Sequence, residues 1–284
     1  MKRAAVIGLG LIGGSVARDL AARGIHVLGY DRDPATLAEA LRDGGIHEAL
    51  TPELDADADV VVVAVPVSAA ASVLRALGPR LRAATLITDV GSTKESIVHA
   101  AEDAGLGARF VGSHPLAGDH HSGWSSSRAG LFDGARVFLS PTPSTGADAL
   151  EAAHALWRDL GAHTEVVDAA EHDRRLASIS HLPQALATAL GSLLAAQEIS
   201  RGDLGPGARD MTRLAGSSPE MWTAIAADNA HHLSEAVGTM EERLGALRDA
   251  LARRDVEWLR GFFEDGNRWF AGGESQPQGH VAGE

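Results

Sequence analysis

The chain opens on Ala4-Ala5-Val6-Ile7-Gly8-Leu9-Gly10-Leu11-Ile12-Gly13, an apolar run that ends in three spaced glycines. The run predicts a buried strand, and the glycines predict a tight turn into a helix over Leu11–Ala22. In a βαβ unit the first glycine permits the turn, the second lets the backbone approach a pyrophosphate, and the third lets helix and strand pack closely. The helix N-terminus then faces the anion. The stretch therefore predicts a dinucleotide site held by residues 8–13.

The next residues complete this unit. Gly24 ends the helix, a strand over His26–Tyr30 follows, and Asp31 stands close to the ~20-residue spacing expected of the carboxylate that accepts the ribose hydroxyls. A carboxylate there repels a 2′-phosphate and favours NAD over NADP, while Arg32 could stack on adenine or tolerate the phosphate. The alternative is that Asp31 only caps a helix that begins at Pro34.

Short apolar runs alternate with Ala/Leu-rich amphipathic stretches over the first 168 residues, which is typical of strand–helix units on a parallel sheet. Strands are predicted at Ala4–Ile7, His26–Tyr30, Val60–Val65, Thr85–Asp89, Arg109–Gly112, Arg136–Leu139 and Thr164–Val167. The β-branched run at Val60–Val65 is continuous rather than alternating, so this strand is expected at the centre of the sheet.

Ligands of parallel sheets bind beyond the carboxyl ends of the strands. This rule places Val65, Pro66 and Ser68, after the third strand, beside the cofactor. It places Gly91 and Ser92, after the fourth strand, at the same site.

The hydrophobic pattern of the sequence changes at Ala169. Beyond this residue the apolar side chains recur with helical spacing, and no further strand is predicted. Helices are predicted at Leu176–Ile199, Arg209–Leu214, Pro219–Leu251 and Asp255–Phe270, with Ser218 as an N-cap before Pro219. The predicted fold class is an α/β Rossmann domain with a doubly wound, mostly parallel sheet over residues 1–168, followed by an all-α substrate and dimerisation domain over residues 169–272. Residues 273–284 are expected to form a disordered tail.

Composition excludes several classes of function. The 284 residues carry a net charge of -13, which disfavours nucleic acid, and no apolar run approaches the roughly 20 residues of a membrane span. The absence of Cys removes disulfides and thiolate chemistry and fits a reducing compartment, so a cytoplasmic location is expected. The neighbouring His120 and His121 lack a carboxylate or thiol set at ligand spacing, and no metal is predicted.

Polar clusters at two predicted strand ends are candidates for chemistry: Gly91-Ser92-Thr93-Lys94 and Ser113-His114-Pro115. A histidine where a nicotinamide ring arrives can accept a proton from a substrate hydroxyl as hydride leaves. From the residues alone, His114 is either this base or a turn residue before Pro115.

Taken together, these segments resemble the prephenate/arogenate dehydrogenases of tyrosine biosynthesis over nearly the whole chain, to about Phe270. The likeness is carried by Gly8–Gly13, Asp89–Lys94, Gly112–Gly118, His172-Asp173, Ser180-His181-Leu182-Pro183, Arg209–Ala215 and Pro219–Trp222. The resemblance implies that His114 is the catalytic histidine, that Ser92 positions the substrate hydroxyl and the nicotinamide, and that Arg213 binds a substrate carboxylate. It also implies the NAD-dependent oxidative decarboxylation of prephenate to 4-hydroxyphenylpyruvate by a homodimer joined through the helical domain.

The chain departs from this family pattern at two places. Asp119-His120-His121 stands where many relatives have a Thr-Glu pair, and Gln184 stands where some have a second histidine. Gln184, Asp119 and His181 are therefore candidates for choosing among prephenate, arogenate and 4-amino-4-deoxyprephenate, and the sequence leaves that choice open.

Other interpretations also remain open. Arg213 lies three residues after Asp210, so it could form a helix-surface ion pair instead of binding substrate. A dehydrogenase of the β-hydroxyacid type needs a catalytic lysine on a helix of the second domain, whereas the lysines here are Lys2 and Lys94. A non-catalytic NAD-binding regulator is the alternative from another class, and the joint presence of His114, Ser92 and Arg213 argues against it.

Overall fold

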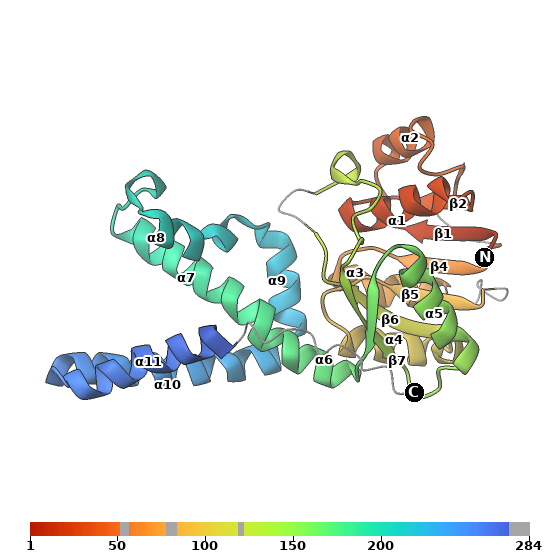
Figure 1. Ribbon diagram of the computed structural model, residues 1–284. Coiled ribbons are helices and arrows are strands. Elements are labelled where there is room, and N and C mark those ends of the chain that lie inside the picture. Colours follow the sequence, from red (N-terminus) through yellow and green to blue (C-terminus); the bar gives the residue numbers. More distant parts are fainter. Residues whose placement is uncertain (52–56, 78–83, 119–121, 273–284) are drawn as a thin grey trace, which may run out of the picture. The chain divides into compact units, whose positions relative to one another are not determined.

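A computed structural model describes residues 1–51, 57–77, 84–118 and 122–272 (Figure 1). The expected tail at residues 273–284 and the Asp119-His120-His121 segment lie outside the described residues. The chain divides into two compact units, residues 1–233 and 234–284. The predicted domain boundary after residue 168 stays a prediction. None of the described helices is long and apolar enough to cross a membrane.

One eight-stranded sheet, in the order β3-β2-β1-β4-β5-β6-β7-β8, organises the N-terminal part of the chain. Its strands are β1 (Arg3–Ile7), β2 (His26–Tyr30), β3 (Glu48–Ala49), β4 (Val60–Val63), β5 (Leu86–Asp89), β6 (Phe110–Pro115), β7 (Arg136–Pro141) and β8 (His163–Val166). All neighbouring pairs are parallel except β6 and β7, which are antiparallel. The predicted α/β class with a mostly parallel sheet is therefore confirmed.

Helices cover both faces of this sheet, as Figure 1 shows. They are α1 (Leu11–Ala22), α2 (Pro34–Arg42), α3 (Val67–Leu77), α4 (Glu95–Asp103) and α5 (Ala147–Asp159). Val60 and Val62 belong to a core with residues of α1, α2 and α5, whereas Val61 and Val63 belong to a core with residues of α3 and α4. Alternate side chains of β4 thus fill opposite cores, which is why its sequence is apolar without interruption.

Most predicted strands differ from the structure by one or two residues at an end, and two strands differ in a more informative way. β3 is an edge strand of two residues, Glu48–Ala49, that pairs with β2, and so short a strand leaves no periodic signal. β6 was predicted to end at Gly112 but continues to Pro115, because β7 pairs with it through the whole of Gly112–Pro115. His114 therefore lies in a strand, opposite Phe138, and the interpretation of His114 as a turn residue is wrong.

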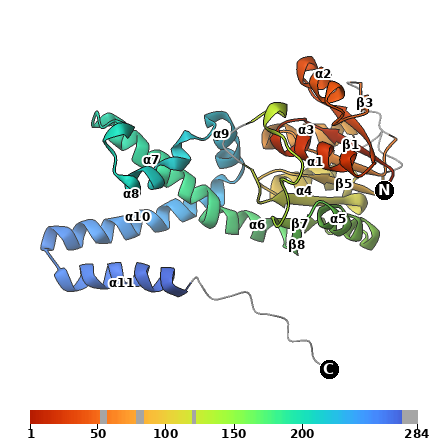
Figure 2. The same cartoon turned by 45° about the horizontal axis from the view of Figure 1, so that its top comes forward.

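The elements that follow the sheet are helical, as predicted. They are α6 (Ala169–Leu176), α7 (Leu182–Ala196), α8 (Pro206–Met211), α9 (Pro219–Asp228), α10 (Ala230–Arg253) and α11 (Val256–Gly272). In the first compact unit, α6 contacts α4 and α9 contacts α3, so α6 and α9 are joined to the helices on one face of the sheet (Figure 2). Ser218 caps α9 as expected, since its hydroxyl accepts a hydrogen bond from the Met221 amide.

Three predicted helices are interrupted. The span Leu176–Ile199 contains a wide π-type turn at Ala177–His181, in which the Leu182 amide donates to the Ala177 carbonyl. The next residue, Pro183, has no N–H with which to continue the hydrogen bonds of a regular α-helix. The span Arg209–Leu214 ends as α8 at Met211 and continues as a tighter turn over Arg213–Gly216. The span Pro219–Leu251 breaks between α9 and α10 at Asn229, whose side chain binds elsewhere.

Candidate active site

The glycine turn between β1 and α1 has the geometry that a bound pyrophosphate needs. Gly8 has φ +95°, and a Cβ there would lie 2.3 Å from the Ala64 carbonyl oxygen. A Cβ at Gly13 would lie 2.0 Å from the Gly8 carbonyl oxygen, so helix and strand touch at this point. A Cβ at Gly10 would meet no described atom within 4 Å. The turn thus requires glycine at positions 8 and 13 and leaves space in front of Gly10, at the start of α1.

Asp31 holds the glycine turn in place. Its carboxylate accepts hydrogen bonds from the Leu9 amide at 2.8 Å and from the Asp33 amide at 2.9 Å. Asp33, and not Asp31, caps α2 by accepting from the Ala35 amide at 3.0 Å. The interpretation of Asp31 as the helix cap is therefore wrong, and its carboxylate lies where β2 ends, beside the turn.

The other residues predicted to bind cofactor lie at the carboxyl ends of the parallel strands. Val65 is half-buried after β4, and Pro66 and Ser68 are exposed where α3 begins. Gly91 is buried after β5, Ser92 beside it is half-buried, and Arg32 is exposed after β2. Because neighbouring parallel strands end at one edge of a sheet, these residues share the edge that carries the glycine turn.

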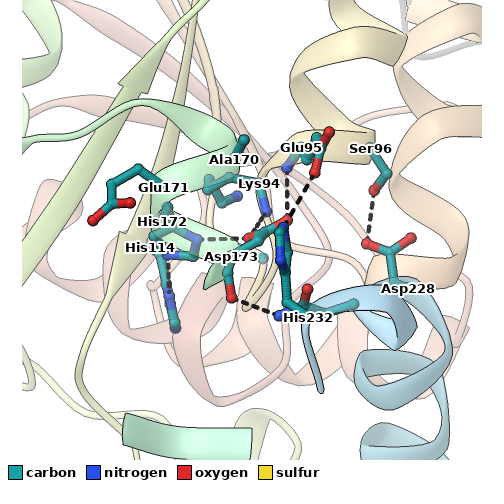
Figure 3. A network of polar contacts seen from close by, with 12 residues as sticks. Lys94, Glu95, Ser96, His114, Ala170, Glu171, His172, Asp173, Asp228 and His232 are labelled. Carbon is teal, nitrogen blue, oxygen red and sulfur yellow. Dashed lines mark hydrogen bonds and ion pairs between the residues drawn. The ribbon is translucent and has the colours of Figure 1, made fainter. Parts of the chain in front are cut away.

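A hydrogen-bonded chain of two histidines and one aspartate lies where β6 meets α6 (Figure 3). Nδ1 of His114 is 2.9 Å from Nε2 of His172, and Nδ1 of His172 is 2.7 Å from Oδ1 of Asp173. All three residues are buried: His114 is 8 % exposed, His172 0 % and Asp173 2 %. These three side chains are thus shielded from bulk water. Hydrogen bonds to charged groups are stronger in such a buried environment than in water.

The aspartate at the end of this chain is fixed by the start of α4. Oδ1 of Asp173 accepts from the Lys94 amide at 2.7 Å, and Oδ2 accepts from the Glu95 amide at 2.9 Å. Burial would raise the pKa of the Asp173 carboxyl, but the hydrogen bonds from His172 and from these amides hold that pKa below its ordinary value. Asp173 is therefore a carboxylate, and a carboxylate can only accept.

The ionised aspartate fixes the protons along the chain. His172 must carry a hydrogen on Nδ1 to donate to Asp173, so neutral His172 accepts at Nε2. His114 then donates from Nδ1, which leaves the lone pair of its Nε2 unprotonated. Burial, followed by the nearby His172 and the Lys94 ammonium, lowers the pKa of His114 well below its ordinary 6.5. Neutral His114 is thus ready to accept a proton at Nε2.

Lys94 and Asp89 form a buried ion pair next to the strand that carries His114. The Asp89 carboxylate also accepts from the Gly91 amide at 2.7 Å and from the Ser113 amide at 3.2 Å. The pair therefore joins the end of β5 to the strand that carries His114. Sequence reasoning assigned no role to Lys94, Asp89, His172 or Asp173, although all four belong to segments that carry the family resemblance.

The predicted substrate-binding residues differ in their surroundings. His181 and Gln184 are buried at the start of α7 and in the turn before it, at 2 % and 5 % exposure. The Gln184 Nε2 donates to the Leu214 carbonyl at 2.8 Å, which ties α7 to the turn that begins at Arg213. Arg213 is exposed in the tight turn that follows α8, whereas Asp210 lies within α8, so the two residues do not share one α-helix.

Two family models match the chain. Residues 16–166 match the nucleotide-binding domain of prephenate dehydrogenase, and residues 168–265 match the dimerization domain of prephenate dehydrogenase. Among curated proteins, the chain is similar to the cyclohexadienyl dehydrogenase of Zymomonas mobilis, with 34 % identity over 278 residues and 94 % of each protein covered.

Solved structures give the same grouping. The chain is similar to the Aquifex aeolicus prephenate dehydrogenase in complex with hydroxyphenyl propionate and NAD+, with a TM-score of 0.89, 32 % identity, and 95 % of this chain and 98 % of that one covered. It is also similar to the arogenate dehydrogenase of Synechocystis, with a TM-score of 0.81, 29 % identity, and 93 % and 97 % covered.

Proposed function

Because the chain belongs to the prephenate dehydrogenase family of oxidoreductases, we propose that it catalyses the NAD-dependent oxidative decarboxylation of prephenate to 4-hydroxyphenylpyruvate in tyrosine biosynthesis. The observation that supports this most directly is the Asp173–His172–His114 chain, which ends in an unprotonated nitrogen at the edge of the sheet.

NAD fits the edge of the sheet that carries the glycine turn. The turn at Gly8–Gly13 would hold the pyrophosphate, and Asp31 with Arg32 would hold the adenosine ribose. Val65, Pro66, Ser68 and Gly91 would line the same edge toward the nicotinamide. When bound, NAD accepts the hydride from the substrate ring.

His114 acts as the base in this proposal. The ring carbon that loses hydride bears a hydroxyl and gains carbonyl character, so removal of the hydroxyl proton to Nε2 of His114 lowers the barrier. The bond from the ring to its carboxylate then breaks, carbon dioxide leaves, and the ring becomes aromatic. His114 returns the proton to the phenolic oxygen, while Ser92 positions that oxygen. Atoms and charge balance without a metal ion.

Arg213 is proposed to bind a substrate carboxylate through its planar guanidinium, which can contact two oxygens at once. Arg213→Ala is expected to raise KM for prephenate roughly 10- to 150-fold, because a lost hydrogen bond to a charged group costs about 1.5–3 kcal/mol. KM for NAD should stay nearly unchanged, as initial-rate kinetics will show. Arg209→Ala is the matched control, since Arg209 is exposed and donates to the Gly202 carbonyl at 3.2 Å. A lower melting temperature with unchanged KM would remove Arg213 from substrate binding.

Asp31→Ala is expected to raise KM for NAD about 10-fold or more and to reduce the preference for NAD over NADP. The ribose hydroxyls of NAD and the Leu9 amide lose the carboxylate that accepts their hydrogen bonds. The 2′-phosphate of NADP is no longer repelled by a negative charge at this position. Asp33→Ala is the control, because it removes the cap of α2 and should cost about 1 kcal/mol of stability without changing the cofactor ratio. An unchanged NAD/NADP ratio in Asp31→Ala would contradict this role of Asp31.

Arogenate is a second candidate substrate, and one observation favours it. The Gln184 Nε2 donates to the Leu214 carbonyl and to Thr188, so the amide orientation is fixed. Its buried Oε1 has no hydrogen-bond partner in the part of the chain that the structure describes. The ammonium group of arogenate is a donor that would satisfy this oxygen, whereas the keto group of prephenate is an acceptor.

The rate of NADH formation from NAD and of NADPH formation from NADP, each measured with prephenate and with arogenate, tests this assignment. A higher kcat/KM for prephenate with NAD supports the main proposal, and a higher value for arogenate supports the second. No reduction of either cofactor with either substrate would contradict both.

We also propose a homodimer joined through the helical domain. The second family match is a dimerization domain. Within residues 234–272, α10 and α11 both expose large apolar side chains, which include Leu244, Leu251, Phe263, Trp269 and Phe270. Apolar surface of this kind is what a symmetric partner buries.

A further inference from the structure

Asn229, between α9 and α10, connects two parts of the site. Its side chain is 3 % exposed, and its Nδ2 lies 2.8 Å from the Asp173 carbonyl oxygen and 3.1 Å from Nδ1 of His181. A carbonyl oxygen can only accept, so the atom facing it is the amide nitrogen, which can only donate. The same amide nitrogen therefore donates to His181, and Nδ1 of His181 must be the acceptor.

This contact decides which nitrogen of His181 carries hydrogen. A neutral imidazole that accepts at Nδ1 has its hydrogen on Nε2, where it becomes a donor. Burial lowers the pKa of His181 to about 4, with Asp173 raising it and His172 lowering it. Through Asn229, His181 is also linked to the backbone of Asp173, the aspartate of the hydrogen-bonded chain that ends at His114. His181 is thus a neutral Nε2–H donor near the proposed base.

A second buried donor lies beside the first. The Trp222 indole of α9 packs edge-to-face on His181, with ring centroids 5.9 Å apart and planes at 77°. Neither Nε2 of His181 nor Nε1 of Trp222 has a hydrogen-bond partner among the residues that the structure describes. Buried polar groups in native proteins are nearly always hydrogen-bonded, so two neighbouring donors without partners indicate an oxygen of a bound ligand.

We propose that Asn229 is a positioning residue that fixes His181 as its Nε2–H tautomer, so that His181 and Trp222 present paired N–H donors to a keto or carboxylate oxygen of the substrate. The inference rests on the proposed function for the identity of the ligand. The tautomer itself does not depend on that function, because it follows from the contacts of Asn229 alone.

The primary test replaces Asn229 with aspartate. In Asn229→Asp the new carboxylate can only accept, so His181 must place hydrogen on Nδ1 and loses the donor at Nε2 when neutral. The ¹⁵N resonances of His181, assigned by comparison with His181→Gln, are expected to show a protonated Nε2 in the wild type and a protonated Nδ1 in the variant. Asn267→Asp is the matched control, since it adds the same charge at an exposed position of α11.

Kinetics of the same variant test the donor pair. KM for prephenate is expected to rise roughly 10- to 150-fold in Asn229→Asp with KM for NAD unchanged, because a donor to a charged or keto oxygen becomes an acceptor. A new ionisation near neutral pH is also expected in the pH profile, since a carboxylate at Nδ1 stabilises protonated His181. An unchanged tautomer overturns the role of Asn229, and a changed tautomer with unchanged KM overturns the donor pair.

Trp222→Phe keeps the inference testable if Asn229→Asp does not fold. Phenylalanine preserves the ring contact with His181 but removes the N–H, so KM for prephenate is expected to rise about 2- to 10-fold, and Trp258→Phe on α11 is the control. Saturation with prephenate should shift the N–H resonances of both His181 and Trp222 in the wild type. If prephenate is not a substrate, saturation with arogenate is the same probe, and unshifted resonances with both ligands overturn the donor pair.

Discussion

His114→Ala is expected to lower kcat about 10²- to 10⁴-fold, which is the usual contribution of a positioned general base. Alanine removes the Nε2 lone pair that Asp173 and His172 keep unprotonated. The Kd for NAD, measured by fluorescence titration, should change little because His114 lies on β6, away from the glycine turn in sequence and in strand order. Steady-state kinetics with prephenate will give the size of the effect.

His154→Ala is the matched control for this prediction. His154 lies on α5, and its ring contacts the Thr164 hydroxyl at 2.7 Å instead of the histidine chain. Its replacement should leave kcat within about twofold, as expected of a residue outside the site. If His114→Ala keeps near-normal turnover, the base must be another group.

The pH dependence of the wild type follows from the same histidine. A lowered pKa means that His114 is neutral, and therefore active as a base, at every pH above that value. The acid limb of kcat/KM should accordingly lie below pH 6.5. The histidines His114, His172 and His181 also stabilise the fold when neutral, and this stabilisation is lost as pH falls below 6.5. Circular dichroism at each pH will separate loss of the base from unfolding.

Lys94→Met is expected to lower the free energy of unfolding by about 3–5 kcal/mol, the usual cost of breaking a buried ion pair from one side. The Lys94 side chain is 0 % exposed, so its removal leaves the Asp89 carboxylate buried, and the Gly91 and Ser113 amides are its remaining donors among the residues that the structure describes. Urea unfolding followed by circular dichroism measures the change. Lys2→Met is the control, since Lys2 is exposed at the start of the chain.

A double variant separates the charge pair from simple packing. In Lys94→Met with Asp89→Asn, no uncompensated charge remains, and most of the lost stability should return. If the double variant is as unstable as Lys94→Met alone, the loss comes from packing of the lysine stem. If Lys94→Met is as stable as the wild type, the ion pair contributes nothing to the fold.

Some features of the fold and site were predictable because their signals are local. The glycine spacing in Gly8–Gly13 predicts a turn from strand to helix, and the close contact of Gly13 with the Gly8 carbonyl oxygen lies within that one βα unit. The continuous apolar run of β4 predicts a strand that is buried on both faces, at the centre of the sheet. Ser218 before Pro219 predicts the start of α9, because the capping hydrogen bond joins its hydroxyl to the amide of Met221, three residues later.

Other features depend on residues that are distant in sequence. β6 continues through His114 only because β7 pairs with it, and no local pattern encodes that partner. His114 and His172 are 58 residues apart, and Asp173 binds the Lys94 amide across 79 residues. The break at Asn229 likewise depends on Asp173 and His181, which its side chain binds.

The sequence by itself determined the Rossmann unit, the sheet class, the helical second half and the family, because periodicity, glycine spacing and short motifs act over a few residues. Only the tertiary structure decided the protonation of the site: the tautomers of His172, His114 and His181, and the pairing of Lys94 with Asp89. The physical reason is that a side chain's proton goes where its hydrogen-bond partner and its burial dictate, and both are set by residues brought together only on folding.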